Sequence, residues 1–217
     1  MMNQRYEGIV DNFNDYTYHI LGCGAIGSSA AMQLVRMGAD SLKLYDRDIV
    51  SEENIGVSQF CGHHVGQAKT HALMSMLYDI NTDIQIKCYN GEFSTYYPED
   101  DNIIILGFDS MTSRKEAVEA ILALKQPDFL IDGRMGAEHY QQYTFKNPTK
   151  TKYLKEWYSD SAGNIEPCNA KATSYCSNMS GSFISNTVRK LVTSQPWHGQ
   201  ISFHFPTMML EKKRWNP

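Results

Sequence analysis

A glycine-rich turn between a short apolar strand and a helix is the feature that most restricts how this chain folds. Tyr16–Leu21 has the composition of a strand, the hexapeptide Gly22–Gly27 (GCGAIG) follows it directly, and Ser28–Met37 has helical spacing. In the pattern G-x-G-x-x-G, the first glycine makes the tight turn and the second lets a phosphate approach the backbone. The third lets the helix and the strand pack closely. The turn therefore predicts nucleotide binding at the start of a helix, with a purely structural turn as the alternative.

An acidic residue ends the next predicted strand. Leu42–Tyr45 runs into Asp46, and Asp48 follows two positions later. Strand, glycine turn, helix, strand and acid together make one βαβ unit of a parallel sheet, in which the acid binds the ribose hydroxyls of a nucleotide. Asp46 is thus a candidate ribose ligand, and the alternative is an ordinary solvated aspartate in a turn.

The rest of the first two thirds extends this unit. Predicted helices at 66–78 and 112–125 alternate with predicted strands at 84–89, 102–106 and 129–131. The run 102–106 (NIIIL) is apolar almost throughout, as expected of a strand buried on both faces. Such alternation predicts an α/β fold, Rossmann-like and doubly wound, with a mainly parallel sheet and helices on both faces.

The last third has a different pattern and predicts an antiparallel C-terminal extension. Residues 139–145 alternate, 150–163 are polar, 179–192 have the spacing of a closing helix, and 201–205 form a final strand with its aromatic residues on one face. We expect one domain over residues 1–217. Its nucleotide-binding core is 16–134, and its C-terminal lobe, 135–217, contains a crossover loop and the closing helix.

Composition narrows the class of protein. The 217 residues are 42% hydrophobic and 20% charged, as in a globular domain, and the net charge of −4 argues against nucleic acid as a partner. No apolar run approaches the roughly 20 residues that cross a bilayer, and residues 1–15 lack the pattern of a signal peptide. The five cysteines are irregularly spaced and form no C-x-x-C pair. We therefore expect neither a disulfide framework nor a four-cysteine zinc site, and a cytoplasmic location without a membrane partner.

The residues after Asp46 resemble the ThiF/MoeB/HesA family of adenylating enzymes, which are related to ubiquitin-activating enzymes. The resemblance rests on DRDIVSEEN at 46–54, Gln59, VGQAK at 65–69 and GFDSMTSR at 107–114. The family has Asp-x-Asp-x-Val, Asn-Leu-x-Arg-Gln, Val-Gly-x-x-Lys and an aspartate after a buried strand. The similarity covers 16–114 and continues more weakly over 132–191. The Asp-Gly-Arg at 132–134 is similar to a compact phage and plasmid branch.

The resemblance implies that the chain uses ATP and Mg²⁺ to adenylate a C-terminal carboxylate of a small ubiquitin-like or sulfur-carrier protein, as a homodimer. Lys69 would neutralise phosphate charge, Asp109 would hold Mg²⁺, Arg114 would lie near the phosphates, and Arg134 would face the substrate tail. The apolar strand 201–205 is a candidate dimer interface. The resemblance places these residues around ATP: Gly22, Gly24, Ala25, Ile26, Gly27, Asp46, Asp48, Asn54, Gln59, Lys69, Asp109 and Ser110.

Each assignment has a plainer alternative. These are a solvated helix lysine for Lys69, a helix cap for Asp109, an ion pair within its own helix for Arg114, and a salt bridge to Glu138 for Arg134.

The chain also departs from the family pattern. The arginine of Asn-Leu-x-Arg-Gln is absent, because Val57 and Ser58 occupy its place. Its positive charge would have to come from Arg5, Arg47, Arg134 or a partner subunit. The absence leaves a non-catalytic binding partner as an alternative, and the glycine turn with Asp46 leaves an NAD-dependent oxidoreductase as another.

A cysteine is the candidate for a later acyl-transfer step. In several ThiF-like proteins the nucleophile lies some 20 residues before the end of the closing helix, which corresponds here to Cys168, with Lys171 nearby to favour its thiolate. An inert, half-buried thiol is the alternative. His63 and His64 are adjacent and lack a third ligand in the sequence, so we expect no metal ion there.

Overall fold

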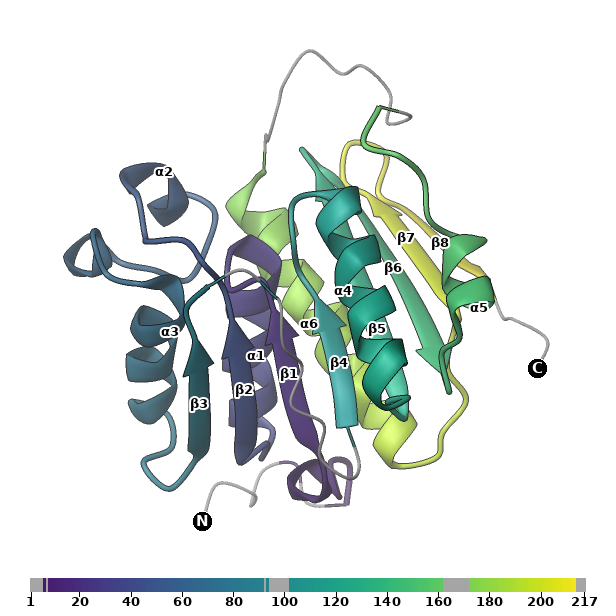
Figure 1. Cartoon of the computed structure of the whole chain (residues 1–217), viewed down its shortest axis with the longest axis horizontal. Helices are drawn as coiled ribbons and strands as arrows, with labels where there is room; N and C mark the ends of the chain where they lie inside the picture. Colours follow the sequence, from purple (N-terminus) through teal and green to yellow (C-terminus); the bar gives the residue numbers. More distant parts are fainter. Residues whose placement is uncertain (1–5, 7, 92, 94–101, 162–171, 214–217) are drawn as a thin grey trace.

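An eight-stranded sheet forms the centre of the molecule, in the order β3-β2-β1-β4-β5-β6-β7-β8 (Figure 1). This computed structural model describes residues 6, 8–91, 93, 102–161 and 172–213. The first five strands in this order, from β3 to β5, are parallel to one another. Strands β6, β7 and β8 each pair antiparallel with the strand before them. The bounds are β1 Thr17–Leu21, β2 Ser41–Tyr45, β3 Gln85–Tyr89, β4 Asn102–Leu106, β5 Phe129–Gly136, β6 His139–Lys146, β7 Gln200–His204 and β8 Met209–Lys213. The predicted α/β fold with an antiparallel extension is confirmed.

Helices cover both faces of the sheet. Figure 1 shows α4 in front of the sheet and α1 and α6 behind it. The α-helices are α1 Ala25–Arg36, α2 Glu52–Ile55, α3 Lys69–Tyr78, α4 Met111–Leu124, α5 Lys150–Leu154 and α6 Ser174–Val192, and the 3-10 turns are η1 Phe13–Asp15 and η2 Gly62–His64. Within these described segments, no helix combines the length and the apolar character needed to cross a bilayer.

Two hydrophobic cores result, one on each face of the sheet. Residues of α1, α3 and α6 pack in one core with Ile20 and Leu44. Residues of α4 and α5 pack in the other with Leu21 and Leu106. Neighbouring side chains of one strand point to opposite faces, and because both faces are covered, β1, β2 and β4 are buried at almost every position. All five residues of β4 are buried, as its sequence predicted.

Small residues bring the closing helix α6 against α1, the helix that follows the glycine turn. A Cβ atom at Gly181 would lie 2.3 Å from Ser29 Oγ and 2.7 Å from the Ser29 backbone. Ser177 Oγ donates a hydrogen bond of 2.9 Å to the carbonyl oxygen of Ala25. The C-terminal third therefore supports the start of α1 directly.

Two elements in the last third, β8 and α5, are not expected from the sequence. The strand at 201–205 is not the final one, because β7 pairs along its outer edge with β8. Every residue of β8 is exposed. A strand without a buried face lacks the alternation of apolar and polar residues by which a sequence predicts a strand. The candidate interface at 201–205 is consequently not a free sheet edge. The polar stretch 150–163 contains a short helix, α5, whose Tyr153 is buried.

Candidate nucleotide-binding site

The loops after β1 and β4 lie side by side at the carboxyl edge of the sheet. The chain runs outward from β1 to β3 and then crosses to β4 on the other side of β1, so the direction of winding reverses between these strands. Ligands of open α/β sheets bind at such a reversal. The amide of Gly107 donates to Leu21 O over 2.7 Å, which joins the two loops at their start.

Steric contacts between the two loops account for Gly22 and Gly27. Gly22 has φ +90°, and a Cβ atom on it would lie 2.7 Å from the carbonyl carbon of Gly107. A Cβ atom on Gly27 would lie 1.8 Å from Gly22 O. A side chain at Gly22 would push the two loops apart, and one at Gly27 would collide with Gly22 within the same turn. Both glycines are therefore required by the fold itself, with or without a ligand.

Gly24 differs from these two glycines. A Cβ atom on Gly24 would meet nothing within 4 Å, and its φ of −75° is accessible to other residues. Gly24 is the N-cap of α1 and has no side chain, so it offers no side-chain acceptor to the first amide groups of the helix, at Ala25 and Ile26. Packing does not require a glycine here, but close approach of an anion to the backbone does.

Asp46 links the glycine turn to the end of β2. One carboxylate oxygen accepts the Cys23 amide at 2.7 Å, and the other accepts the Asp48 amide at 2.9 Å. Partial burial raises the pKa of Asp46, while the amide groups of Asp48 and Cys23 and the positive charge of Lys69 lower it. Asp46 is therefore anchored beside the turn, in contrast to the solvated aspartate of the alternative reading.

Lys69 lies at the start of α3 and points back toward the same edge. Its Nζ is 2.8 Å from Asp48 Oδ2, and only 11% of its side chain is exposed, against 55% for Asp48. The amide of Lys69 donates to Asp48 O, so backbone and side chain fix this lysine together. Arg47, 66% exposed, contributes a second cation 3.9 Å from Asp48. The solvated-helix alternative for Lys69 is wrong, because the ammonium group is largely covered and paired.

Asp109 follows β4 on an exposed loop, adjoining the glycine turn through Gly107. The cap alternative is wrong, because the N-cap of α4 is Ser110, whose Oγ accepts the amide of Ser113. Among the residues that the structure describes, no side chain pairs with the Asp109 carboxylate. It remains available to a ligand at the edge of the sheet.

Asp160 is a residue of this region that the sequence did not indicate. Its carboxylate accepts the amides of Met111 at 2.6 Å and Thr112 at 3.1 Å, and the Thr112 hydroxyl at 2.7 Å. The hydroxyl of Thr112 is the main cause that lowers the pKa of Asp160. The segment after α5 is thereby fixed to the N-terminus of α4, one turn from Asp109. No local motif marks this contact, since 49 residues separate Asp160 from Met111.

Arg114 is buried beneath the β4–α4 loop. Its guanidinium donates to the carbonyl oxygens of Leu106, at 3.4 Å, and of Phe108, and it pairs with Asp132 on β5. The alternative, an ion pair within its own helix, is wrong, because the partner acid lies on the neighbouring strand. Arg114 holds the backbone that presents Asp109, and its place near the phosphates stays a prediction.

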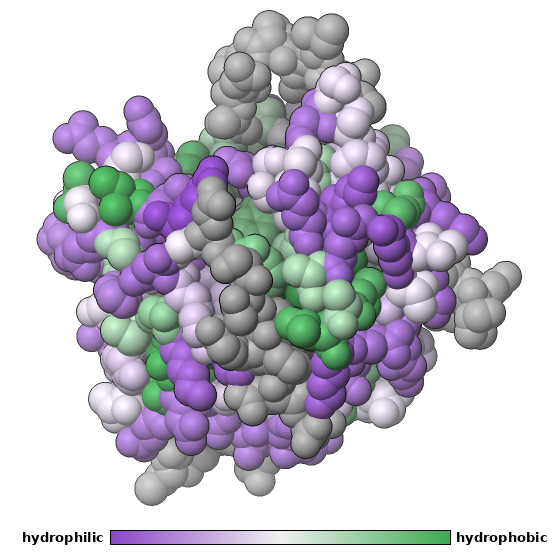
Figure 2. All heavy atoms as spheres, in the orientation of Figure 1, coloured by the Kyte–Doolittle hydropathy of each residue, from purple (hydrophilic) through white to green (hydrophobic). Residues whose placement is uncertain are grey.

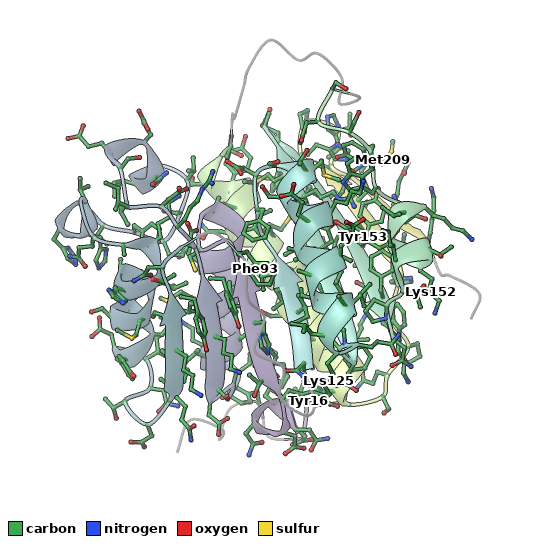
Figure 3. All side chains as sticks on the ribbon, viewed as in Figure 1. Tyr16, Phe93, Lys125, Lys152, Tyr153 and Met209 are labelled. Carbon is green, nitrogen blue, oxygen red and sulfur yellow. The ribbon has the colours of Figure 1, made fainter. Side chains whose placement is uncertain are left out.

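Arg134 shares the same acid. Its Nε and Nη2 donate to Asp132 Oδ2 at 2.9 and 2.7 Å, and its Nη1 donates to Glu156 O. The Tyr153 hydroxyl donates to the same carboxylate oxygen at 3.1 Å, and Figure 3 shows this tyrosine lying between α5 and α4. The alternative, a salt bridge between Arg134 and Glu138, is wrong, and the predicted contact of Arg134 with the substrate tail stays a prediction. The guanidinium is buried and also stacks on Tyr143, 4.2 Å from the ring centroid.

Asn54 and Gln59 take structural positions on the segment between β2 and α3. Asn54 closes a capping box at the start of α2, where its side-chain oxygen accepts the Ser51 amide at 3.0 Å. The Gln59 amide nitrogen donates to Asn178 Oδ1 on α6 at 2.6 Å. Figure 2 shows apolar atoms at the upper left, over this same segment, where Ile49 and Val65 are exposed. The expected position of Asn54 and Gln59 near a nucleotide stays a prediction.

The cysteines differ in how suitable they are as nucleophiles, because some of them are buried. Cys168 lies outside the described residues, so its role stays a prediction. Cys23 and Cys176 are buried, as expected of core residues, and burial raises the pKa of Cys176 to about 11. Cys176 is consequently protonated near neutral pH and a poor nucleophile.

The expectation that His63 and His64 lack a third ligand is wrong. Cys61 is a candidate third ligand, because the ligand atoms of all three side chains lie within 4.8 Å of one another. The sequence pattern C-x-H-H contains this signal, but histidine pairs alone do not reveal it.

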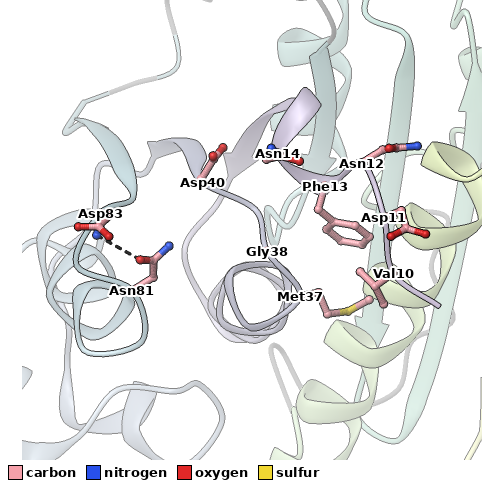
Figure 4. Close-up of a pocket in the computed structure, with 10 residues that line it drawn as sticks. All are labelled: Val10, Asp11, Asn12, Phe13, Asn14, Met37, Gly38, Asp40, Asn81 and Asp83. Atoms are coloured by element: carbon pink, nitrogen blue, oxygen red, sulfur yellow. Dashed lines mark hydrogen bonds between the residues drawn. The ribbon is translucent and has the colours of Figure 1, made fainter. Parts of the chain in front are cut away.

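A separate cavity of about 550 Å³ lies at the opposite edge of the sheet (Figure 4). It is lined by η1 and the residues before it, and by the loops that precede β2 and β3, including Asp40 and Asp83. These are amino ends of parallel strands, whereas ligands of such sheets bind at the carboxyl ends. We therefore do not assign nucleotide binding to this cavity.

Taken with the fold, the glycine turn, the anchored Asp46 and the paired Lys69 at the carboxyl edge define a nucleotide-binding α/β domain of the Rossmann type. The pattern of the ThiF family matches residues 6–213. The chain belongs to the ThiF family.

Individual relatives agree with this membership. A ubiquitin-like modifier-activating enzyme 5 from Oryza sativa subsp. japonica is 34% identical over 119 residues, which are 54% of this chain and 28% of the relative. One from Branchiostoma floridae is 36% identical over 98 residues, which are 44% of this chain and 24% of the relative. The chain therefore spans about a quarter of the length of the curated relatives it matches.

Solved structures share the fold at lower identity. The microcin C7 biosynthetic enzyme MccB in complex with N-formylated MccA has a TM-score of 0.78 at 17% identity, covering 95% of this chain and 66% of that one. E. coli MccB with ATP gives 0.75 at 18% identity, covering 95% and 65%. PaaA gives 0.72 at 18%, covering 93% and 64%.

Proposed function

We propose that this chain binds ATP on the turn Gly22–Gly27 and adenylates the C-terminal carboxylate of a small ubiquitin-like or sulfur-carrier protein. The observation that carries the proposal is the convergence of the glycine turn, Lys69 and Asp109 at the reversal between β1 and β4, in a ThiF fold. An oxidoreductase would use the turn and Asp46 but needs neither of the other two. The names of the modifier-activating relatives and the structure of MccB with ATP support the choice of reaction.

The reaction itself explains the charges. A carboxylate oxygen attacks the α-phosphorus of ATP, a new P–O bond forms, and the bond to pyrophosphate breaks, so that acyl adenylate and pyrophosphate are the products. Two anions have to approach each other, and fixed positive groups lower that cost. In this proposal the amide groups at the start of α1 bind phosphate, Lys69 neutralises its charge, and Asp46 binds ribose. Arg47 is the exposed arginine beside the site, whereas Arg134 is already bound to Asp132.

The residues at the site also fit a magnesium ion. Mg²⁺ is held by one or two carboxylates together with phosphates and water, and Asp109 presents an exposed carboxylate at the end of β4. Bound there with the nucleotide, the ion would supply charge neutralisation of the phosphates.

Nucleotide-dependent stabilisation tests the proposal. Thermal unfolding is measured with ATP and Mg²⁺, AMP, NAD and NADP in parallel, for the wild type, Lys69→Met and the control Lys152→Met on α5. A ligand at 100 times its Kd stabilises the native state by about 2.7 kcal/mol. We expect a shift with ATP and Mg²⁺ that is reduced in Lys69→Met and kept in Lys152→Met.

A shift with NAD alone would instead favour an oxidoreductase. Stabilisation by ATP without ATP–pyrophosphate exchange on any tested carrier protein would favour a non-catalytic binding partner.

A further inference from the structure

A second cluster of ligating side chains lies at η2, between α2 and α3. Cys61 and His63 are exposed and His64 is buried, with all three ligand atoms within 4.8 Å of one another. The cluster borders a cavity of about 500 Å³ whose other walls are Met32 and Arg36 of α1 and the C-terminal part of α3. We propose that Cys61, His63 and His64 bind a zinc ion.

The local backbone brings the ligands to one side before any metal binds. In the capping box of η2, the Cys61 sulfur accepts the amide of His64, and the Cys61 amide donates to His64 Nδ1 at 2.9 Å. The thiolate is the form of cysteine that binds a metal ion. The ring of His63 lies 4.0 Å from that of His64, centroid to centroid.

The donor set selects the metal. One thiolate and two imidazoles suit Zn²⁺, which prefers sulfur and nitrogen in tetrahedral sites, whereas Mg²⁺ and Ca²⁺ require oxygen. Binding releases the thiol proton of Cys61 to solvent. A metal ion at His64 Nδ1 replaces the Cys61 amide as partner of that lone pair, and the exposed amide then bonds to water.

Three protein ligands leave the fourth position of a tetrahedral zinc ion open. Asp79 and Arg36 are the charged side chains that line the cavity with the cluster, so a water molecule in the fourth position has a carboxylate near it. The walls come from α1 and α3, and the glycine turn is not among them. All three ligands belong to the turn 61–64, so the ion would fix the conformation of this turn beside α1 and α3.

Metal titration of the full chain, without an affinity tag and stripped by chelator, tests the inference. Zn²⁺ affinity is measured in competition with a chromophoric chelator, and Co²⁺ is used as a spectroscopic probe. We expect one ion per chain and a sulfur-to-cobalt charge-transfer band. Cys61→Ser keeps a hydrogen-bond acceptor for the cap but loses the thiolate, so it should fold normally. Its zinc affinity should fall more than about 100-fold, beyond the loss from removing an outer partner.

His71→Ala is the control, since His71 lies on α3 outside the cluster and contacts Asn90. His63→Ala, an exposed position, should lose affinity as Cys61→Ser does. Equal zinc affinity in wild type and Cys61→Ser, or a Co²⁺ spectrum without the thiolate band, would overturn the proposal. None of these readouts depends on adenylation.

Discussion

The three glycines of the turn Gly22–Gly27 are needed for different physical reasons. At Gly22 and Gly27 a side chain would collide with backbone atoms of this protein, so these positions are fixed by folding. At Gly24 nothing in the protein occupies the space of a side chain. A mutation at Gly24 therefore separates ligand binding from stability, which mutations at the other two cannot do.

Gly24→Val is expected to fold with little change in the free energy of unfolding but to lose at least tenfold in ATP affinity, about 1.4 kcal/mol. The reason is that the new side chain enters the space where phosphate approaches the backbone. Isothermal titration with ATP measures it. Gly136→Val is the matched control, because a Cβ atom at Gly136, at the end of β5, also meets nothing within 4 Å. Unchanged ATP affinity in Gly24→Val would make the turn purely structural.

Asp109→Asn tests the metal position. Since Ser110 and not Asp109 caps α4, stability should be unchanged, and so should ATP binding without Mg²⁺. Loss of metal-assisted charge stabilisation should reduce ATP–pyrophosphate exchange about a thousandfold, equivalent to about 4 kcal/mol in the transition state. Exchange is measured with a carrier protein on which the wild type is active. A variant within a few-fold of wild type would place the metal site elsewhere.

At the scale of elements, the N-terminus of α4 is stabilised from a distant segment. The carboxylate of Asp160 accepts four hydrogen bonds from Ser110, Met111 and Thr112. Two of them come from amide groups that have no partner within the helix. A negative charge at this end is also favourable to the helix dipole. The same contact holds the chain that leads from α5 toward α6, so the loop carrying Asp109 and the crossover segment share an anchor.

Asp160→Ala should cost about 1 kcal/mol of stability at neutral pH, as for loss of a helix cap. The pKa of Asp160 is lowered in the folded protein, so its contribution is complete above its ordinary pKa of about 3.9 and is lost as the pH falls through the lower folded value. Urea unfolding of wild type and variant at several pH values measures this. The difference between them should shrink below about pH 4; a constant difference down to pH 2 would show that the charge is not involved.

At the scale of the whole molecule, one buried carboxylate joins several elements. Asp132 on β5 binds Arg114 of α4, Arg134 of its own strand and Tyr153 of α5. Two guanidinium groups and one carboxylate leave a positive charge in a nearly dry region. This network fixes the loop after β4 and the start of the crossover segment relative to the sheet.

Asp132→Ala should therefore destabilise the fold by about 3–5 kcal/mol, because it leaves two buried cations without a negative counter-charge. Glu119→Ala is the control. It removes the ion pair between Glu119 and Lys150, whose side chains are 36% and 61% exposed, and should have little effect on stability. Chemical denaturation measures both. A cost for Asp132→Ala as small as that of the control would show that the network contributes little to stability.

The sequence by itself determined the βαβ unit, the doubly wound sheet and three positions of the candidate site. Gly24, Asp46 and Asp109 each follow a predicted strand, and parallel strands end at the same edge, so their proximity follows from chain order alone. Hydrophobic periodicity is a property of contiguous residues. For that reason the sequence alone predicts the buried strand at 102–106.

Only the tertiary structure decided which groups become partners. Arg114 pairs with Asp132 and not with an acid of its own helix, Asp160 caps α4, and β8 covers β7. These contacts join segments far apart in the chain, and charge or hydrogen-bonding capacity alone offers each group many partners. Packing of the two helical layers against the sheet brings one partner within reach of each group and buries it there, where an unpaired charge is costly.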